Sequence, residues 1–332
     1  MGIEETGKTV IILLNMGGPS NLDEVQPFLF NLFSDKDLID LPLFMKPFQK
    51  PLAKLIALFR SKGTKEMYRQ IGGGSPILSL TKNFAANVEM GLRERGVNAE
   101  VKVVMRYTHP RAKEIVKTLQ RGDSVVLFPQ YPHFANSTTG SSIKDFLQSY
   151  FERFPKGKDP IVIGDWGTEP FYINWWISGI REEVSRLHEI GVKNDIHVIF
   201  SSHGLPMRYF KKGETYKDSI DKSRLKIIEG LKDLDVTFHQ AYQSRAGPFP
   251  WLQPYTDELI EELAGSKAVV MVPLGFVTDH VETSYEIDIL YGNLAKQQNI
   301  DHFRRIPVPN DNPSYSEEAA NFLAHLIQGG DT

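Results

Sequence analysis

The chain has 332 residues, of which 41% are hydrophobic and 24% are charged, so it is long enough for two domains with a sizeable core in each. Its formal net charge of −3 gives no electrostatic reason to expect nucleic acid, and we expect a small-molecule partner instead. The sequence has no cysteine, which excludes disulfides, thiolate metal sites, a cysteine nucleophile and a cysteine-held iron–sulfur cluster, so any metal must be held by histidine, carboxylate or substrate.

Seven apolar, β-rich runs predict strands along the chain, and segments with helical periodicity separate most of them. This alternation predicts an α/β fold with parallel sheets and covering helices. The predicted strands lie at 9–15, 101–107, 124–130, 160–165, 196–202, 236–242 and 267–276. The predicted helices lie at 113–121, 142–153, 174–190, 219–234 and 316–328.

The turn-rich segment 153–159 predicts the seam between two lobes. We expect an amino-terminal lobe over 1–160, a carboxy-terminal lobe over 161–310, and a terminal segment, 311–332, whose helix has the first lobe as a candidate packing surface. The first strand begins too close to Met1 for a signal peptide, and no run of about 18 apolar residues occurs. We therefore expect a cytoplasmic protein that does not span a membrane.

Residues 41–65 are rich in Leu, Phe, Ile and Met, and they include six basic residues and no acidic one. Their prolines argue against one continuous helix before Pro51, so we expect a lip with a helix from about Leu52. Basic side chains on an apolar element attract anionic lipid headgroups. Peripheral membrane contact through 28–65, at the inner face of the membrane, and ordinary packing both fit this composition.

Three glycine-containing loops are candidates for binding phosphate. They are NMGGP at 15–19, GGGSP at 72–76 and STTGSS at 137–142. None has the spacing of a Walker loop or of a dinucleotide loop, which argues against a nucleotide enzyme. The glycines still indicate a backbone that turns sharply or approaches a ligand closely.

The segment 273–288, PLGFVTDHVETSYEID, places Asp279, His280, Glu282 and Glu286 directly behind an apolar strand. Ligands of open α/β sheets bind at the carboxyl ends of the strands. If the chain turns helical after this strand, Glu282 and Glu286 lie on one face, where their like charges raise at least one pKa unless a cation lies between them. A solvated first helical turn is the structural alternative.

A second strand-end candidate is His203 in FSSHGLP, which follows the strand at 196–202. A single histidine is more often structural than catalytic. However, His203 lies at a strand end, and so does the acidic cluster behind the strand at 267–276, which favours a catalytic role. The two groups are therefore expected to face one cleft.

Together these motifs resemble the ferrochelatase family, and the resemblance covers almost the whole chain. In the carboxy-terminal half it rests on FSSHGLP, GETY at 213–216, YQSRAGPFPWLQP at 242–254 and VPLGFVTDHVETSYEID. In the amino-terminal half it rests on LNMGGP, FLFNLFSDKDLIDLP at 28–42, YRQIGGGSPI at 68–77, MRYTHP at 105–110 and STTGSS. The resemblance implies a chelatase-like α/β fold of two similar doubly wound lobes with parallel sheets, a porphyrin cleft between them, and the terminal step of heme biosynthesis.

That reaction inserts Fe²⁺ into a porphyrin with release of two protons, and it requires a base and a route for the metal. The resemblance implies that His203 and Glu282 are the catalytic and metal-binding residues, with Asp279, His280 and Glu286 in support. Whether His203 accepts protons or delivers iron stays open. No cofactor is required, because Fe²⁺ is a substrate, and no iron–sulfur cluster is expected.

The resemblance also implies a porphyrin site. Met16 occupies a position where Met accompanies protoporphyrin IX and Tyr accompanies coproporphyrin III, so protoporphyrin IX and heme b are expected. Oligomeric state is left open by the sequence. The implied porphyrin contacts are Met16, Leu29, Leu32, Ile39, Arg69, Tyr242 and Phe276.

Three positions depart from the family pattern. Leu290 stands where many relatives have a third glutamate, Asn136 where cluster-bearing relatives have a ligand cysteine, and Gln70 where a basic residue is common. The alternatives are a coproporphyrin III ferrochelatase, a non-catalytic porphyrin- or heme-binding protein on the same fold, and a cobalt or nickel chelatase for a sirohydrochlorin-type ring.

Overall fold

The chain divides into two compact units, Met1–Gly164 with Asn310–Thr332, and Asp165–Pro309. Each unit has its own sheet and covering helices. The part of the predicted lip that falls on residues 40–42 lies outside the described residues. The computed structural model describes residues 7–39, 43–247 and 249–329.

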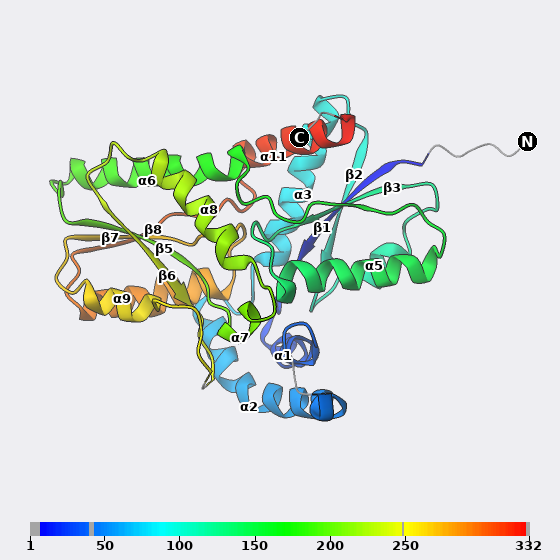
Figure 1. Ribbon diagram of the computed structural model, residues 1–332, viewed down its shortest axis with the longest axis horizontal. Coiled ribbons are helices and arrows are strands. Elements are labelled where there is room, and N and C mark those ends of the chain that lie inside the picture. Colours follow the sequence, from blue (N-terminus) through cyan, green and yellow to red (C-terminus); the bar gives the residue numbers. More distant parts are fainter. Residues whose placement is uncertain (1–6, 40–42, 248, 330–332) are drawn as a thin grey trace, which may run out of the picture. The chain divides into compact units, whose positions relative to one another are not determined.

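The first unit is built on a parallel sheet with the strand order β2-β1-β3-β4 (Figure 1). Its strands are β1 (Thr9–Asn15), β2 (Ala99–Met105), β3 (Ser124–Pro129) and β4 (Ile161–Val162). Its helical segments are η1 (Leu22–Glu24), α1 (Val25–Ser34), η2 (Leu43–Phe48), α2 (Gln49–Gln70), α3 (Ile77–Glu94), α4 (Ala112–Val116), η3 (Asn136–Gly140), α5 (Ser141–Arg153) and α11 (Pro313–Gln328).

Residues 10–14 of β1 are all apolar because helices cover both faces of the sheet. Val10, Ile12 and Leu14 form one face, and they pack in a cluster with residues of α4 and α5. On β3, Phe128 contacts Phe322 of α11, with ring centroids 6.2 Å apart. Helices on both faces of a parallel sheet are the doubly wound arrangement.

A buried carboxylate anchors the end of α1 to the sheet. Asp35 accepts hydrogen bonds from the Tyr107 hydroxyl at 2.7 Å and the Ser141 hydroxyl at 2.5 Å, and Arg106 Nη2 lies 3.0 Å away. Burial raises the pKa of this carboxyl, but the Ser141 hydrogen bond, the Arg106 charge and the Tyr107 hydrogen bond outweigh burial, so the pKa is lowered. Asp35 therefore stays ionised inside the protein.

Helix α11 packs against α3 within this unit. Arg95, directly after α3, hydrogen-bonds Asn321 and lies 3.2 Å from Glu317 of α11. The Asn312 side chain accepts from the Tyr315 backbone N–H and caps the start of α11. The carboxy-terminal helix is thus part of the first unit.

The second unit repeats this plan with the strand order β6-β5-β7-β8, again all parallel. In each sheet the first strand is central, the second lies on one side, and the third and fourth lie on the other. The predicted α/β fold of two similar doubly wound lobes is thereby confirmed. The strands are β5 (Ile196–His203), β6 (Thr237–Gln243), β7 (Ala268–Val272) and β8 (His302–Arg305). The helical segments are α6 (Pro170–Glu189), α7 (Met207–Phe210), α8 (Tyr216–Glu229), α9 (Thr256–Glu262), η4 (Glu282–Tyr291) and α10 (Gly292–Gln297).

Within the second unit, α9, η4 and α10 cover one face of the sheet. Leu259 of α9, Ile287 of η4 and Ala295 of α10 pack in one cluster with Ile199 and Met271 of the strands. Helices α6 and α8 lie together on the other face (Figure 1). The packing fixes η4 against the sheet at the end of β7.

Some element boundaries differ from the sequence prediction. The predicted strand at 160–165 is reduced to the two residues of β4. Helix α2 begins at Gln49 instead of Leu52, since Pro51 lies in the first helical turn, where its missing N–H has no partner to lose. None of the helices within the described residues combines the length and the apolar character needed to cross a bilayer.

Candidate active site

Two adjacent strands of the second sheet bring the predicted catalytic histidine to its carboxyl edge. His203 is the last residue of β5 and pairs with Gln243, the last residue of β6. The next residue, Gly204, donates its N–H to the Gln243 carbonyl at 2.9 Å, and a Cβ at this position would lie only 3.0 Å from that oxygen. The glycine thus allows the chain to turn away immediately behind the histidine.

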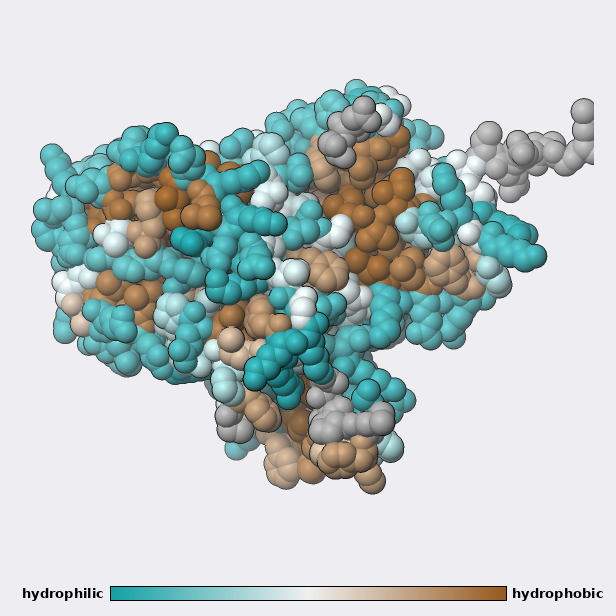
Figure 2. All heavy atoms as spheres, in the orientation of Figure 1, coloured by the Kyte–Doolittle hydropathy of each residue, from teal (hydrophilic) through white to brown (hydrophobic). Residues whose placement is uncertain are grey.

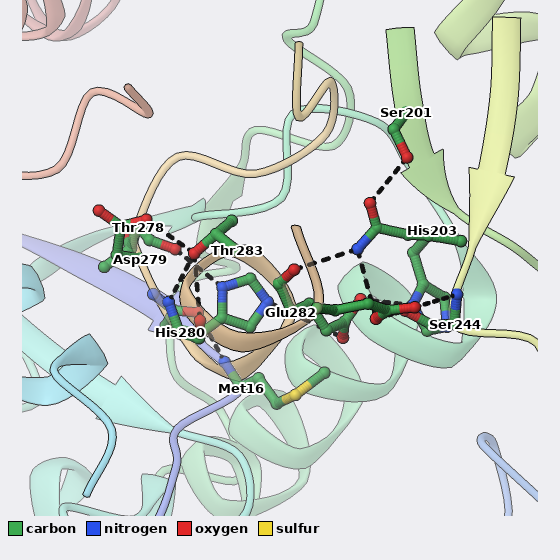
Figure 3. A network of polar contacts seen from close by, with 12 residues as sticks. Met16, Ser201, His203, Ser244, Thr278, Asp279, His280, Glu282 and Thr283 are labelled. Carbon is green, nitrogen blue, oxygen red and sulfur yellow. Dashed lines mark hydrogen bonds and ion pairs between the residues drawn. The ribbon is translucent and has the colours of Figure 1, made fainter. Parts of the chain in front are cut away.

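The acidic residues lie on η4, which is a π-helical segment and not the α-helix that their spacing suggested. A π-helix is wider than an α-helix and is frequent at functional sites. Glu282 is its first residue and points towards Ser244, directly after β6 (Figure 3). Glu286 follows on the same side and also contacts Ser244.

His203 and Glu282 form a direct pair. Nδ1 of His203 lies 2.7 Å from Oε2 of Glu282, and both side chains are partly buried. Burial lowers the pKa of His203, but the Glu282 carboxylate more than offsets burial, so the pKa is raised. Burial raises the pKa of Glu282, but the charges and hydrogen bonds of His203 and His280 outweigh burial and hold this pKa well below its usual range.

Ser244 connects the two carboxylates. Its Oγ lies 3.0 Å from Oε2 of Glu282 and 2.5 Å from Oε2 of Glu286, and its backbone N–H donates to Oε1 of Glu286 at 2.8 Å. Ser244 has a φ of 65°, in the left-handed region, directly after β6. This backbone conformation turns both the N–H and the hydroxyl towards η4.

Glu286 differs from Glu282 in its electrostatics. Burial and the neighbouring Glu282 charge raise the pKa of Glu286, although Ser244 and Tyr291 donate hydrogen bonds to it. The Tyr291 hydroxyl lies 2.9 Å from Oε1 of Glu286. Relative to an ordinary glutamate, Glu282 is therefore shifted towards the charged form and Glu286 towards the protonated form.

The supporting residues hold the start of η4. Nδ1 of His280 lies 3.0 Å from the Thr278 carbonyl, which makes Nδ1 the donor and leaves Nε2 facing Oε1 of Glu282 at 3.8 Å. The Thr283 hydroxyl lies 2.7 Å from Oδ1 of Asp279. This bond links Asp279 to the segment that carries Glu282.

Arg305 of β8 ties this segment to the sheet. Its guanidinium lies 3.1 Å from Asp279 and makes two bonds to Asp288, at 2.6 Å and 2.9 Å. These contacts fix η4 on both sides of its glutamates.

Arg305, Ser244, Tyr291 and Gln243 were not singled out from the sequence. Ser244 and Gln243 stand at the end of the neighbouring strand, inside the quoted motif YQSRAGP, and this position is the signal that could have indicated them.

The two remaining predicted residues of this unit have different surroundings. The Phe276 ring lies 4.9 Å from the His280 ring, centroid to centroid, and is half-buried. Tyr242 is only 2% exposed, and its buried hydroxyl has no hydrogen-bond partner among the described residues. The structure therefore groups His203, Glu282, Glu286, His280 and Phe276 most closely.

The first unit carries the other predicted porphyrin contacts. Met16 follows β1 directly and is half-buried, as are Leu32 and Ile39, whereas Leu29 is buried in α1. Arg69 is exposed near the end of α2 and pairs with Glu66 at 2.9 Å. These residues thus lie on or shortly after β1, α1 and α2 of the first unit.

His203 and Glu282 supply an imidazole and a carboxylate that could hold a metal ion. Imidazole and carboxylate suit a borderline divalent cation. Within the part of the chain that the structure describes, no set of three or more histidines and carboxylates is arranged to hold a metal.

Comparison with known proteins gives one consistent answer. The ferrochelatase family model matches residues 8–328. The ferrochelatase of Trichormus variabilis is 40% identical over 328 residues, covering 97% of this chain and 83% of that protein. The ferrochelatase of Prochlorococcus marinus is 38% identical over 333 residues, covering 96% of this chain and 83% of that protein.

Two solved structures share the fold at low identity. CbiX, described as the terminal enzyme for siroheme biosynthesis in denitrifying bacteria, has a TM-score of 0.50 at 10% identity and covers 95% of this chain and 98% of its own. SirB from Bacillus subtilis with Fe³⁺ has a TM-score of 0.51 at 12% identity, covering 98% and 99%. Because the family model spans nearly the whole chain, including both strand-end clusters, the chain belongs to the ferrochelatase family.

Proposed function

We propose that this ferrochelatase-family enzyme inserts Fe²⁺ into protoporphyrin IX, giving heme b and two protons. One observation carries the proposal: His203 and Glu282 are bonded at 2.7 Å at the carboxyl edge of a parallel sheet, beside a second carboxylate whose pKa is raised. This set supplies a base, a cation ligand and an acceptor for a second proton in one place.

His203 would meet the reactants through its Nε2 atom. Since Nδ1 bonds to the Glu282 carboxylate, a neutral ring carries its proton on Nδ1 and presents the Nε2 lone pair. That lone pair can accept a pyrrole proton or ligate Fe²⁺. The Glu282 charge stabilises the imidazolium that protonation forms.

Protons would leave through the contacts of Ser244. Its hydroxyl lies within hydrogen-bond distance of both carboxylates, so it can accept a proton from a protonated Glu282 while it donates its own proton to Glu286. The third glutamate of many relatives is replaced by Leu290, which is 48% exposed. Two carboxylates and one hydroxyl would therefore carry the protons in this chain.

The choice of protoporphyrin IX is supported by Met16 and by the apolar lip. In the proposed complex, Leu29, Leu32 and Ile39 belong to the apolar side of the porphyrin site, and Arg69 binds a propionate. Arg69 would have to exchange its exposed partner Glu66 for that propionate. Tyr242 and Phe276 are the proposed ring neighbours in the second unit. No further cofactor and no iron–sulfur cluster take part.

The lip is also proposed to dock on the inner face of an anionic membrane, where poorly soluble protoporphyrin is available to a cytoplasmic enzyme. Figure 2 shows hydrophobic surface gathered over α2. The exposed apolar residues there are Phe44, Phe48, Leu55, Leu58 and Phe59, with exposed fractions of 77%, 62%, 51%, 56% and 75%. Lys46, Lys50, Lys54, Arg60, Lys62 and Lys65 supply positive charge on the same two elements, η2 and α2. Such a mixture suits the boundary between acyl chains and acidic headgroups.

The decisive experiment is anaerobic Fe²⁺ insertion followed by absorbance, with protoporphyrin IX and coproporphyrin III in competition. Wild type should prefer protoporphyrin IX, and His203→Ala should lose insertion while it still binds porphyrin. Preference for coproporphyrin III would overturn the substrate proposal. Tight porphyrin binding without insertion by wild type would favour the non-catalytic alternative.

A further inference from the structure

A pair of histidines lies at the opposite edge of the second sheet from the proposed catalytic site. His197 and His239 lie near the amino-terminal ends of β5 and β6. His239 pairs with Ile199, two residues after His197, so both imidazoles project from the same face of the sheet on neighbouring strands. His203 is six residues further along β5, on the order of 20 Å away at about 3.3 Å per residue.

The two rings are in direct contact. Nδ1 of His197 lies 3.0 Å from Nε2 of His239, and the ring centroids are 5.2 Å apart with an interplanar angle of 40°. Two nitrogens bound to one tetrahedral Zn²⁺ at about 2.0–2.1 Å are roughly 3.3 Å apart. The observed spacing is therefore within about 0.3 Å of that required, and each ring would tilt by roughly 35° to aim its lone pair at the ion.

A carboxylate fixes the first ring from behind. Oδ1 of Asp195 lies 3.0 Å from Nε2 of His197, so this nitrogen is the donor and Nδ1 carries the lone pair. Asp195 is itself held, because its Oδ2 accepts the Lys267 N–H at 3.0 Å and its carbonyl accepts the Ala268 N–H at 3.2 Å. Histidines that bind metals typically donate their second nitrogen to a carboxylate in this manner.

We propose that His197 and His239 form a second metal site, which takes one divalent transition ion of the Zn²⁺ class with water in the remaining positions. The His197 side chain is 16% exposed and His239 is half-buried, so solvent can complete the coordination. Imidazole suits Zn²⁺, Cu²⁺ and Ni²⁺ and does not favour Mg²⁺ or Ca²⁺. This site does not depend on the proposed function of His203 and Glu282.

The test is equilibrium binding of Zn²⁺ to the full chain without a polyhistidine tag, in a His203→Ala background that removes the other candidate site. This variant should bind one equivalent. Adding His239→Gln should abolish that equivalent, and adding Asp195→Asn should weaken its affinity by about 10–100-fold. His109→Gln is the matched control, because His109 also contacts a carboxylate, at 2.7 Å, but has no imidazole partner in the described structure.

Each outcome decides the proposal. Retention of the equivalent in the His239→Gln variant, or the same loss in the His109→Gln control, would overturn it, as would an absence of Zn²⁺ binding in the His203→Ala background. Asp195→Asn retains both imidazoles, so weakened binding in this variant with an unchanged far-ultraviolet spectrum would support a positioned metal ligand independently of any folding defect caused by His239→Gln.

Discussion

Nδ1 of His203 lies 2.7 Å from Oε2 of Glu282, so the pKa of His203 is raised and the pKa of Glu282 is lowered. Between these two values both groups are charged. A base must be neutral to accept a proton, so His203 would become active as the pH rises through a pKa above its ordinary 6.5. The pair titrates as a unit, and its apparent pKa values belong to both residues.

The first prediction concerns Glu282→Gln. Without the Glu282 carboxylate, burial outweighs the smaller effect of the Glu286 charge and lowers the pKa of His203, so the alkaline-rising limb of kcat/KM should move from above pH 6.5 to below it. The rate should also fall by about 10²–10⁴-fold through loss of proton handling. A pH–rate profile from pH 5 to 9 measures both effects, and an unmoved limb in an active variant would contradict the assignment of His203 as the base.

Stability should follow the same pair, with opposite signs for its two members. The raised pKa of His203 stabilises the fold at low pH, and this contribution is lost as the pH rises through that pKa. The lowered pKa of Glu282 stabilises the fold above its ordinary value of 4.5, and this contribution is lost as the pH falls through the lowered value. Glu282→Gln should therefore lower Tm most between about pH 4.5 and 6.5.

The second prediction concerns Ser244→Ala, which removes the hydroxyl shared by the two carboxylates. Hydrogen bonds to charged groups contribute about 1.5–3 kcal/mol, so kcat should fall by roughly ten- to hundredfold while the porphyrin KM changes little. Ser266→Ala is the control, because the Ser266 hydroxyl bonds only to the Leu263 carbonyl at 2.7 Å among the described residues. A wild-type kcat in Ser244→Ala would exclude the proposed proton route.

The third prediction concerns the anchor of α1. Asp35→Asn removes the buried carboxylate that lies 3.0 Å from the half-buried Arg106 and leaves Arg106 with Asp145 alone, which should reduce the free energy of unfolding by about 1.5–3 kcal/mol. Asp145→Asn should have a smaller effect, since Asp145 is more exposed and lies 3.5 Å from Arg106. Urea denaturation at neutral pH measures both, and equal effects would show that burial of Asp35 does not matter.

The fourth prediction tests the membrane proposal. Leu58→Ser should reduce flotation with phosphatidylglycerol vesicles, and pure phosphatidylcholine vesicles should bind wild type more weakly because they lack the negative charge. Leu225→Ser is a matched control, since Leu225 is 57% exposed on α8 and Leu58 is 56% exposed on α2. Equal flotation of the two variants would count against docking through the lip. Leu29 is unsuitable for this test because it is buried.

The sequence was sufficient to predict which candidate residues lie at the ends of strands. His203 and the acidic segment behind β7 were predicted because strands in parallel sheets place their last residues at one edge. The pairing of His203 with Glu282 was predicted only from the family resemblance, and the structure supplies its geometry, with Nδ1 2.7 Å from Oε2. Ser244 could not be predicted in its role, because that role depends on a φ of 65° and on the greater width of a π-helix.

The burial of a polar residue and the length of a strand could not be predicted either, because both depend on distant parts of the chain. The motif FLFNLFSDKD contains Asp35, but the local pattern does not distinguish a buried aspartate from a solvated one. Its partners Tyr107 and Ser141 come from distant parts of the chain, and only tertiary packing brings them together. Likewise, the short β4 reflects how little of its segment pairs with β3.

The contacts of Arg305 stabilise the π-helical segment that carries Glu282 and Glu286. A π-helical turn is intrinsically less stable than an α-helical one and would tend to rewind, which would change the separation of Glu282 and Glu286. Arg305 hydrogen-bonds Asp279, which precedes Glu282, and Asp288, which follows Glu286. These bonds hold the π-helical segment at both ends in the absence of a metal ion. A guanidinium on the outermost strand thus sets the spacing of two carboxylates with which it makes no ion pair, and reorganisation of these carboxylates during turnover is kept small.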